Sequence, residues 1–281
     1  MNPINKSVVD KVISEIKSEL SDFKISDKNL EKFGKVDNMD EEYLSYVNGV
    51  GGHYVKFLAL LVKKLQFHNI VELGNREGLS TLSIYDQLPQ DSTFTTIDIV
   101  EDVRYCPDSM HMDSRVKFIL GDVCDIDVFS KLPDKIDLLF SDTIHYDFQV
   151  RDEFAIYQHL LADTALVAVD DIFINDKHLF WDDLPYDKWD LSELCHSNGW
   201  GLFLYKREKS VSYDKRLYDS AHAAAKIWQR RSNEKSSELL TIKNKTVTQI
   251  LKRITKKIPG VYKLFCRINN KFNLIKMDTR I

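Results

Sequence analysis

The spacing of the apolar residues changes its period near residue 68. Before that point, apolar side chains recur at helical spacing over residues 7–33 and from Tyr54 to Leu65, with polar and charged residues between them. These two patterns predict an N-terminal helical cap over residues 1–66. From residue 69 onward, short apolar runs alternate with helical segments, which favours an α/β fold with a doubly wound parallel sheet.

The alternating region ends near residue 212, after a last apolar run that follows a long acidic and aromatic stretch. Strands are expected at Asn69–Leu73, Thr93–Asp98, Val116–Gly121, Ile136–Ser141, Ala165–Val169 and Gly201–Lys206. Helices are expected at Leu79–Leu88, near Val128–Leu132 and at Val150–Leu161. Residues 67–212 therefore form the predicted main domain, and residues 213–281, which are rich in Lys and Arg, form a predicted helical extension.

Composition fits one domain of ordinary size with appendages. The chain has 281 residues, of which 43% are hydrophobic, so it can bury a full core. Its four cysteines form no CxxC pair, which argues against a zinc knuckle or a disulfide framework and favours a reducing cytosol. The N-terminus lacks the apolar core of a signal peptide, and no apolar run is long enough to span a bilayer. Neither secretion by signal peptide nor a membrane-spanning helix is expected.

A glycine turn follows the first strand of the alternating region. In residues 71–81, VELGNREGLST, Gly74 and Gly78 permit a tight turn and the close approach of a ligand, and a helix opens directly after them. Neither GxGxxG nor a GxxxxGK phosphate loop is present, so a nucleotide pyrophosphate is not the favoured ligand. The pattern ExGxxxGxST resembles the first motif of class I S-adenosylmethionine-dependent methyltransferases. A βα turn of some other α/β fold is the plainer alternative.

This resemblance implies a seven-stranded sheet whose last strand is antiparallel, together with a binding site for S-adenosylmethionine. Within the motif, the cofactor residues would be Glu72, Gly74, Asn75, Gly78, Ser80 and Thr81. Asp98, which ends the second strand, stands where the ribose hydroxyls would be bound, and a helix or loop cap is its alternative. Asp122, after the third strand, resembles the acid that meets the adenine amino group. Asp125 and Asp127 compete with it for this role.

Three acids and a histidine follow the next two strands. Asp142 and His145 lie after the fourth strand in SDTIHYD, and Asp170 and Asp171 end the following strand in VAVDD. Like charges on one rim of a sheet persist when a cation neutralises them, and oxygen ligands select a hard ion such as Mg²⁺ over zinc. The alternative is that Asp170 and Asp171 cap the following segment or that one of them points to solvent.

The spacing of these residues is similar to that of metal-dependent sugar O-methyltransferases of the macrocin and mycinamicin type. The resemblance covers residues 69–206 and implies that Asp142, Asp170 and Asp171 bind the metal while His145 is the general base. Asp142 would also lie against the cofactor and take part in catalysis. Asp152 completes a DxxHxxxxxxD pattern, as a structural acid behind the site. Asp163 stands in a turn where many members of this family have two glycines.

The acceptor is expected to carry vicinal hydroxyls, which occur on sugars and on catechols. The position of His145 favours a sugar. The loop from Phe173 to Trp189 is the expected substrate cover, because aromatic faces stack on sugar rings, and Trp181, Tyr186 and Trp189 are its candidate contacts. A surface loop anchored by a few aromatic residues is the alternative.

The charge of the chain is divided unevenly. Residues 1–205 carry 19 basic and 37 acidic side chains, whereas residues 206–281 carry 20 and 6. Residues 240–281 combine basic residues with apolar positions at helical spacing, which fits peripheral contact with an anionic membrane. Packing on the main domain or on a second subunit of a homo-oligomer is an alternative, and nucleic acid is supported by charge but by no recognised motif.

The sequence therefore predicts a cytoplasmic Mg²⁺- and S-adenosylmethionine-dependent O-methyltransferase that modifies a saccharide. A role in surface polysaccharide biosynthesis at the inner membrane surface fits the basic tail. A catechol-like or natural-product acceptor is one alternative. Another is a non-catalytic scaffold that keeps the cofactor fold and is recruited to a membrane by its tail.

Overall fold

The computed structural model describes residues 4–30, 52–101 and 103–209. The N-terminal cap contains α1 (Lys6–Glu19) and α3 (His53–Leu65). The side chain of Asn5 caps α1 by accepting a hydrogen bond of 3.1 Å from the Val8 amide, and the apolar face of the helix is buried. The helix ends at Glu19, earlier than its apolar spacing predicted. The predicted basic extension lies outside the described residues, as does the predicted boundary at residue 212.

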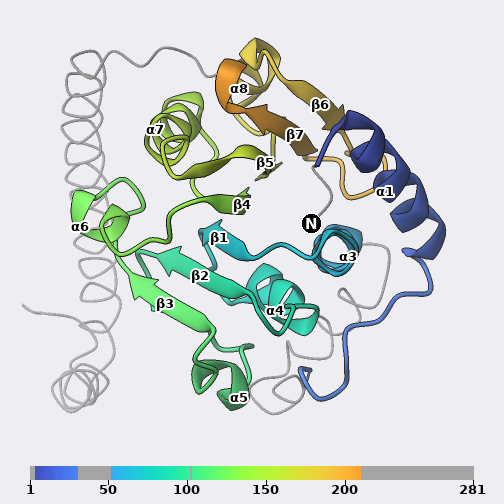
Figure 1. Cartoon of the computed structure of the whole chain (residues 1–281), viewed down its shortest axis with the longest axis vertical. Coiled ribbons are helices and arrows are strands. Elements are labelled where there is room, and N and C mark those ends of the chain that lie inside the picture. The colour runs from blue at the N-terminus through green and yellow to red at the C-terminus, as the bar shows by residue number, and fades with distance from the viewer. Residues whose placement is uncertain (1–3, 31–51, 102, 210–281) are drawn as a thin grey trace, which may run out of the picture. The chain divides into compact units, whose positions relative to one another are not determined.

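Seven strands form a single sheet in the described part of the chain. They are β1 (Asn69–Leu73), β2 (Thr93–Asp98), β3 (Val116–Leu120), β4 (Ile136–Ser141), β5 (Leu161–Asp170), β6 (Asp187–Asp190) and β7 (Trp200–Lys206). The strand order is β3-β2-β1-β4-β5-β7-β6, and β7 runs antiparallel to both of its neighbours (Figure 1). This confirms the predicted α/β class and the antiparallel last strand.

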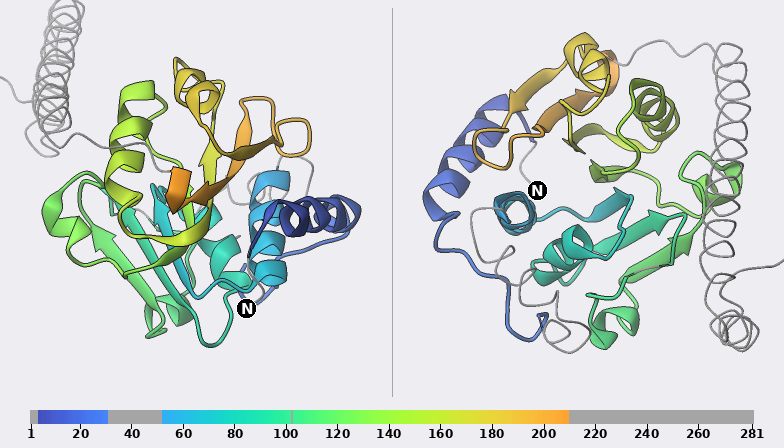
Figure 2. Two further views of the ribbon diagram at one scale, coloured as in Figure 1. Left: turned by 45° about the horizontal axis from the view of Figure 1, so that its top comes forward. Right: turned by 180° about the vertical axis from the view of Figure 1, so that it is seen from behind.

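Helices cover both faces of the sheet. They are α4 (Leu79–Asp86), α5 (Asp108–His111), α6 (Ile126–Phe129), α7 (Asp147–Tyr157) and α8 (His178–Asp183), with a 3₁₀ turn, η1, at Arg207–Lys209. Figure 1 shows α3 and α4 on one side of the sheet and α7 on the other, and Figure 2 shows the same layers from two further directions.

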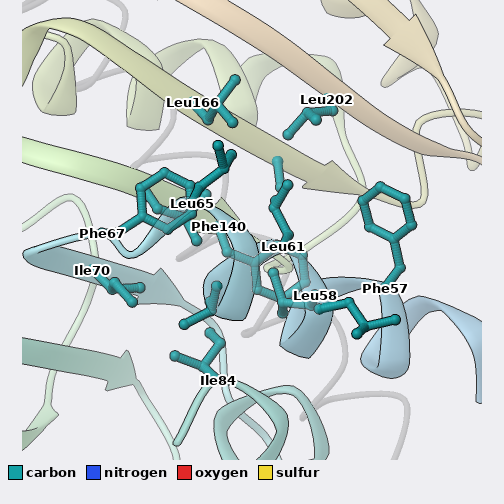
Figure 3. Packing of buried hydrophobic residues seen from close by; sticks show 14 of the residues in the cluster. Phe57, Leu58, Leu61, Leu65, Phe67, Ile70, Ile84, Phe140, Leu166 and Leu202 are labelled. Atoms are coloured by element: carbon teal, nitrogen blue, oxygen red, sulfur yellow. The ribbon is translucent and has the colours of Figure 1, made fainter. Parts of the chain in front are cut away.

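The two faces bury separate hydrophobic clusters. Along β1, Ile70 belongs to the cluster under α3 and α4, whereas Val71 belongs to the cluster under α7 and α8. Successive side chains of a strand point to opposite faces, so one central strand contributes to both cores. Figure 3 shows the first cluster, in which Leu58 and Leu61 of α3 face Phe140 and Leu166 of the sheet.

Several elements differ from the sequence prediction, among them the short helices α5 and α8, which were not predicted. The strand β5 begins at Leu161, which was assigned to the preceding helix, so α7 ends four residues earlier than expected. The edge strand β6 lies within the stretch interpreted as irregular. It pairs only with β7, its residues are half-buried or exposed, and it therefore lacks the apolar run of a buried strand. Among the described helices, none has the length and apolar content that a bilayer crossing requires.

Candidate active site

The glycine turn after β1 is pressed against the end of β4. Gly74 has a φ of +83°, and a Cβ at this position would lie 2.1 Å from the backbone oxygen of Asp142. Gly78 has a φ of +93° and precedes α4, and its Cβ would lie 2.6 Å from the Cys106 sulfur. Only glycine fits either position, so the turn packs closely against the residues around it, including Asp142.

Glu72 is buried behind this turn. Its Oε2 accepts hydrogen bonds of 2.7 Å from the hydroxyls of Thr81 and Thr96, which ties β1 to α4 and to β2. Its Oε1 is buried and has no hydrogen-bond partner among the described residues. Burial raises the pKa of Glu72 to about 7. Ser80 is buried as well. These residues support the turn from behind, and their direct contact with a cofactor stays a prediction.

Asp98 fixes the front of the turn. Its Oδ2 accepts hydrogen bonds of 2.8 Å from the amides of Asn75 and Arg76, and its Oδ1 accepts one of 2.9 Å from the Val100 amide. Asn75 donates from its side chain to the Thr96 hydroxyl, and its Oδ1 is buried without a partner in the described structure. Asp98 therefore lies at the turn as expected, and its contact with a ribose stays a prediction.

Asp122 lies after β3, on the neighbouring strand end. Its Oδ1 accepts a hydrogen bond of 2.9 Å from the Cys124 amide, which closes a local turn. The amide of Gly121 donates to the backbone oxygen of Asp98 at 2.8 Å, so the ends of β2 and β3 are joined. The adenine contact of Asp122 is compatible with this position and remains untested.

The structure brings the predicted catalytic residues together. Ligand atoms of Asp142, His145 and Asp171 all lie within 4.8 Å of one another, and His145 Nε2 is 3.2 Å from Asp171 Oδ2. Asp171 has a φ of 52°, a left-handed conformation that is rare for a residue with a side chain. Asp170, the last residue of β5, is buried and belongs to a second group of the same kind, with Asp171 and His196.

Three polar residues at this site were not predicted from the sequence. His196, between β6 and β7, places Nε2 2.8 Å from Asp170 Oδ1. Lys177 is fully buried and donates a hydrogen bond of 2.7 Å to the backbone oxygen of Asp170. Glu153, in α7, is buried under the loop after β4. None of the three belongs to a recognised motif or ends a strand, so no sequence signal singled them out.

Glu153 takes the structural place that was predicted for Asp152. Its carboxylate accepts hydrogen bonds from Ser141 at 2.7 Å, Thr143 at 2.5 Å and Gln149 at 2.8 Å. Two of these donors flank Asp142 in the sequence, so Glu153 holds the segment that carries the catalytic candidates. Asp152 is half-buried, and burial together with the charge of Glu153 raises its pKa to about 6.

The electrostatics of the cluster favour binding of a cation. Burial raises the pKa of Asp142 well above its usual value, the charge of Asp170 raises it further, and Lys177 opposes the rise. Burial lowers the pKa of His145, although Asp171 opposes this shift. His145 is therefore neutral near pH 7 and able to accept a proton. Carboxylates and imidazoles that converge from separate strand ends suit a divalent cation.

The predicted aromatic substrate cover is wrong for this structure. Trp181 and Tyr186 are 5% and 6% exposed and belong to the hydrophobic cluster under α7 and α8. Trp189 lies in β6, donates from its indole nitrogen to Asp10 at 2.7 Å, and is covered by the ammonium of Lys6. Trp181 and Tyr186 therefore fill the core, and Trp189 anchors α1.

The described site fits S-adenosylmethionine and a divalent cation by its own chemistry. Gly74 and Gly78 leave no room for a side chain, because a Cβ at either position would overlap Asp142 or Cys106, so the turn is narrow. Glu72 and Asn75 each keep one buried oxygen without a hydrogen-bond partner in the described structure, and both are acceptors close to the turn.

Comparisons with known proteins agree with this geometry. Residues 71–172 match a family model described as a methyltransferase domain. No curated protein matches the chain. A methyltransferase from Geobacter sulfurreducens is similar in structure, with 18% sequence identity, a TM-score of 0.50 and coverage of 73% of this chain and 99% of that one. The SAH-bound methyltransferase PaMTH1 from Podospora anserina has 15% identity and a TM-score of 0.50, with coverage of 73% and 98%.

The matched residues run from β1 to just beyond Asp171, so they include the glycine turn and the acids of the cluster. The two solved structures share the fold of this chain over the greater part of its length. The family model covers little more than a third of the chain, and the two solved structures show that the fold is shared.

Proposed function

We propose that this protein transfers the methyl group of S-adenosylmethionine to a hydroxyl of a saccharide, with a divalent cation such as Mg²⁺ at the acid cluster. The observation that carries the proposal is the contact between the glycine turn and the end of β4. A Cβ on Gly74 would touch the backbone oxygen of Asp142, and Asp142 belongs to one ligand group with His145 and Asp171. Methyl donor and acceptor oxygen would therefore meet within a few residues of each other.

The residues of the cluster have separate tasks in this proposal. When bound, the cofactor supplies an electrophilic methyl group and the cation lowers the pKa of the acceptor hydroxyl. His145 would accept the hydroxyl proton, and the carboxylate of Asp171, 3.2 Å from its Nε2, would stabilise the imidazolium that forms. Asp142, Asp170 and Asp171 hold the cation. Glu153 keeps the loop of Asp142 and His145 in position.

The acceptor would contact a different set of apolar residues from the set predicted. Ile144 and Tyr146 flank His145 and are 41% and 38% exposed, and Phe173, two residues after Asp171, is 47% exposed. Exposed apolar side chains beside a polar cluster suit the flat faces of a sugar or of an aromatic ring. The preference for a sugar rests on the spacing of Asp142, His145 and the acid pair, and a catechol-like acceptor uses the same residues.

Calorimetric titration of the full chain tests the cofactor. We expect S-adenosylmethionine to bind and NAD to give no heat of binding, and binding of NAD alone would contradict the proposal. Methyl transfer to a panel of saccharides and catechols then tests the reaction. His145→Gln should abolish transfer and preserve cofactor binding, whereas His68→Gln, at the opposite end of β1, should leave both unchanged. Full activity in EDTA would refute the metal requirement.

We further propose that residues 240–281, which lie outside the described structure, bind an anionic membrane surface. The support is the excess of basic residues and the helical spacing of apolar ones. Such contact would hold the enzyme at the inner membrane surface, near polysaccharide precursors. Flotation with liposomes that contain anionic lipid should recover the full chain but not a truncation after residue 212. Equal behaviour would reject the membrane role, and concentration-dependent association of the full chain alone would indicate a homo-oligomer contact instead.

A further inference from the structure

His196 meets the acid cluster from the loop between β6 and β7. Its Nε2 lies 2.8 Å from Asp170 Oδ1, and its Nδ1 lies 3.9 Å from Asp171 Oδ1. The other oxygen of Asp171, Oδ2, faces His145. The two carboxylate oxygens of Asp171 therefore face two different imidazoles, one on each of two separate loops.

Contacts from two other parts of the chain hold His196 in this position. The ring of Tyr54 packs edge-on against the imidazole, with centroids 5.4 Å apart. His53 Nδ1 lies 3.3 Å from the backbone oxygen of Leu194, so the first turn of α3 fixes the same loop. Gly199 has a φ of +99° and its amide donates to the backbone oxygen of His196. The imidazole is thus oriented before any ligand arrives.

We infer that His196 is a ligand of the divalent cation, together with Asp170 and Asp171, and that it makes the site prefer Mn²⁺ or Co²⁺ to Mg²⁺. This inference rests on the metal requirement of the proposed function. Asp170, Asp171 and His196 offer ligand atoms that all lie within 4.8 Å of one another. Mg²⁺ takes oxygen ligands almost exclusively, whereas an imidazole nitrogen is a good ligand for the later first-row metals. A set of three carboxylates alone would not have this added preference.

The competing role for His196 is that of a counter-ion for Asp170. In that case its removal would change the affinities for Mn²⁺ and Mg²⁺ by similar factors. Removal of a ligand lowers affinity most for the metals that favour nitrogen. The ratio of Mn²⁺ to Mg²⁺ affinity therefore separates the two roles, and it does not depend on catalytic activity.

The test uses the metal-stripped full chain with metal ions as the only ligands. Calorimetry gives the affinities of Mn²⁺ and Mg²⁺, and the visible absorption of bound Co²⁺ reports its ligands. His196→Ala should lower Mn²⁺ affinity by at least about tenfold, because loss of even an outer partner of a ligand costs about 10- to 100-fold. Mg²⁺ affinity should change less, and the Co²⁺ spectrum should shift. His68→Gln, at the opposite end of β1 from the acids, is the control and should resemble the wild type.

Additional measurements keep the inference testable if His196→Ala folds poorly. His196→Gln preserves a polar group of similar reach and should keep Mg²⁺ binding while losing the preference for Mn²⁺. In the wild type, pulsed electron paramagnetic resonance of bound Mn²⁺ should detect imidazole nitrogen that is reduced in His196→Gln. An unchanged Co²⁺ spectrum and Mn²⁺ affinity in both variants would overturn the inference, as would a wild type that binds no divalent cation. Binding of S-adenosylmethionine is scored separately, so a failed metal site is distinguishable from a failed methyltransferase.

Discussion

Gly74 and Asp142 are packed so closely that a methyl group on Gly74 would lie 2.1 Å from the backbone oxygen of Asp142. The two residues belong to neighbouring strand ends, and the amide of Asp142 donates to the backbone oxygen of Leu73 at 2.8 Å. The glycine turn and the loop that carries Asp142 are therefore in direct backbone contact, and we expect a substitution in the turn to affect both.

Gly74→Ala should lower stability and cofactor affinity together. Left-handed strain costs about 1–2 kcal/mol and overpacking about 1–3 kcal/mol, so we expect a loss of about 2–5 kcal/mol in the free energy of unfolding. Gly121→Ala is the control, because no left-handed strain applies there and its Cβ would meet one side-chain atom, Cγ2 of Val128, and no backbone. Urea denaturation and calorimetry measure both effects. Equal stability of the two variants would show that the turn is not tightly packed.

Lys177→Met should destabilise the protein more than the same substitution of a less buried lysine that makes similar hydrogen bonds. Lys177 is fully buried, donates to the backbone oxygen of Asp170 and carries a positive charge beside Asp142. Removing one partner of a buried charge typically costs about 3–5 kcal/mol. Lys188→Met is the control, since Lys188 donates to two backbone oxygens at a more exposed position, and it should cost about 1 kcal/mol or less. Thermal and urea unfolding compare the pair, and similar losses would contradict a special role for Lys177.

Glu153→Gln should reduce kcat while leaving the affinity for S-adenosylmethionine nearly unchanged. The carboxylate of Glu153 accepts hydrogen bonds from two hydroxyls and one amide. In the variant, the NH₂ group of the glutamine would face one of these donors, and the lost hydrogen bond should cost about 1–3 kcal/mol of stability. The loop that carries Asp142 and His145 would shift as a result. Asp152→Asn changes the adjacent acid and should be nearly neutral. If Asp152→Asn proves the more damaging of the two, the position predicted from the DxxHxxxxxxD pattern is correct after all.

The parts of the fold that were predictable are those with a strong local signal. The bounds of β1, β2 and β4 match the prediction, because each is a buried run that ends at a polar or glycine residue. The short edge strand β6 was missed because its sequence, DKWD, is half-solvated. The boundary between α7 and β5 was misplaced because a turn was expected at Asp163, which lies inside β5.

The residues of the candidate site likewise include some that the sequence could predict and some that it could not. Asp142, Asp170 and Asp171 were predictable because the carboxyl ends of parallel strands converge at one edge of a sheet. His196 and Lys177 reach this edge from connections whose course depends on tertiary packing, which no spacing rule encodes. Trp181 and Tyr186 were misassigned for a related reason, since an aromatic residue in a long connection can either face solvent or, as here, fill a core.

The buried carboxyl group of Glu72 should make stability depend on pH. Burial raises its pKa from 4.5 to about 7, so between these values the folded state binds more protons than the unfolded chain. The contribution of Glu72 to stability therefore falls as the pH rises from about 4.5 to about 7, and the penalty persists above this range.

Glu72→Gln removes this contribution. Relative to the variant, the wild type should lose stability with rising pH by an amount on the order of 3 kcal/mol, at about 1.4 kcal/mol per pKa unit. Urea denaturation at a series of pH values across the window measures the difference, and Glu193→Gln, at an exposed position, is the control that should follow the wild type. Parallel pH profiles for the wild type and Glu72→Gln would mean that the pKa of this carboxyl group is not raised. Its surroundings would then be more accessible to water than its burial and its hydrogen bonds with Thr81 and Thr96 indicate.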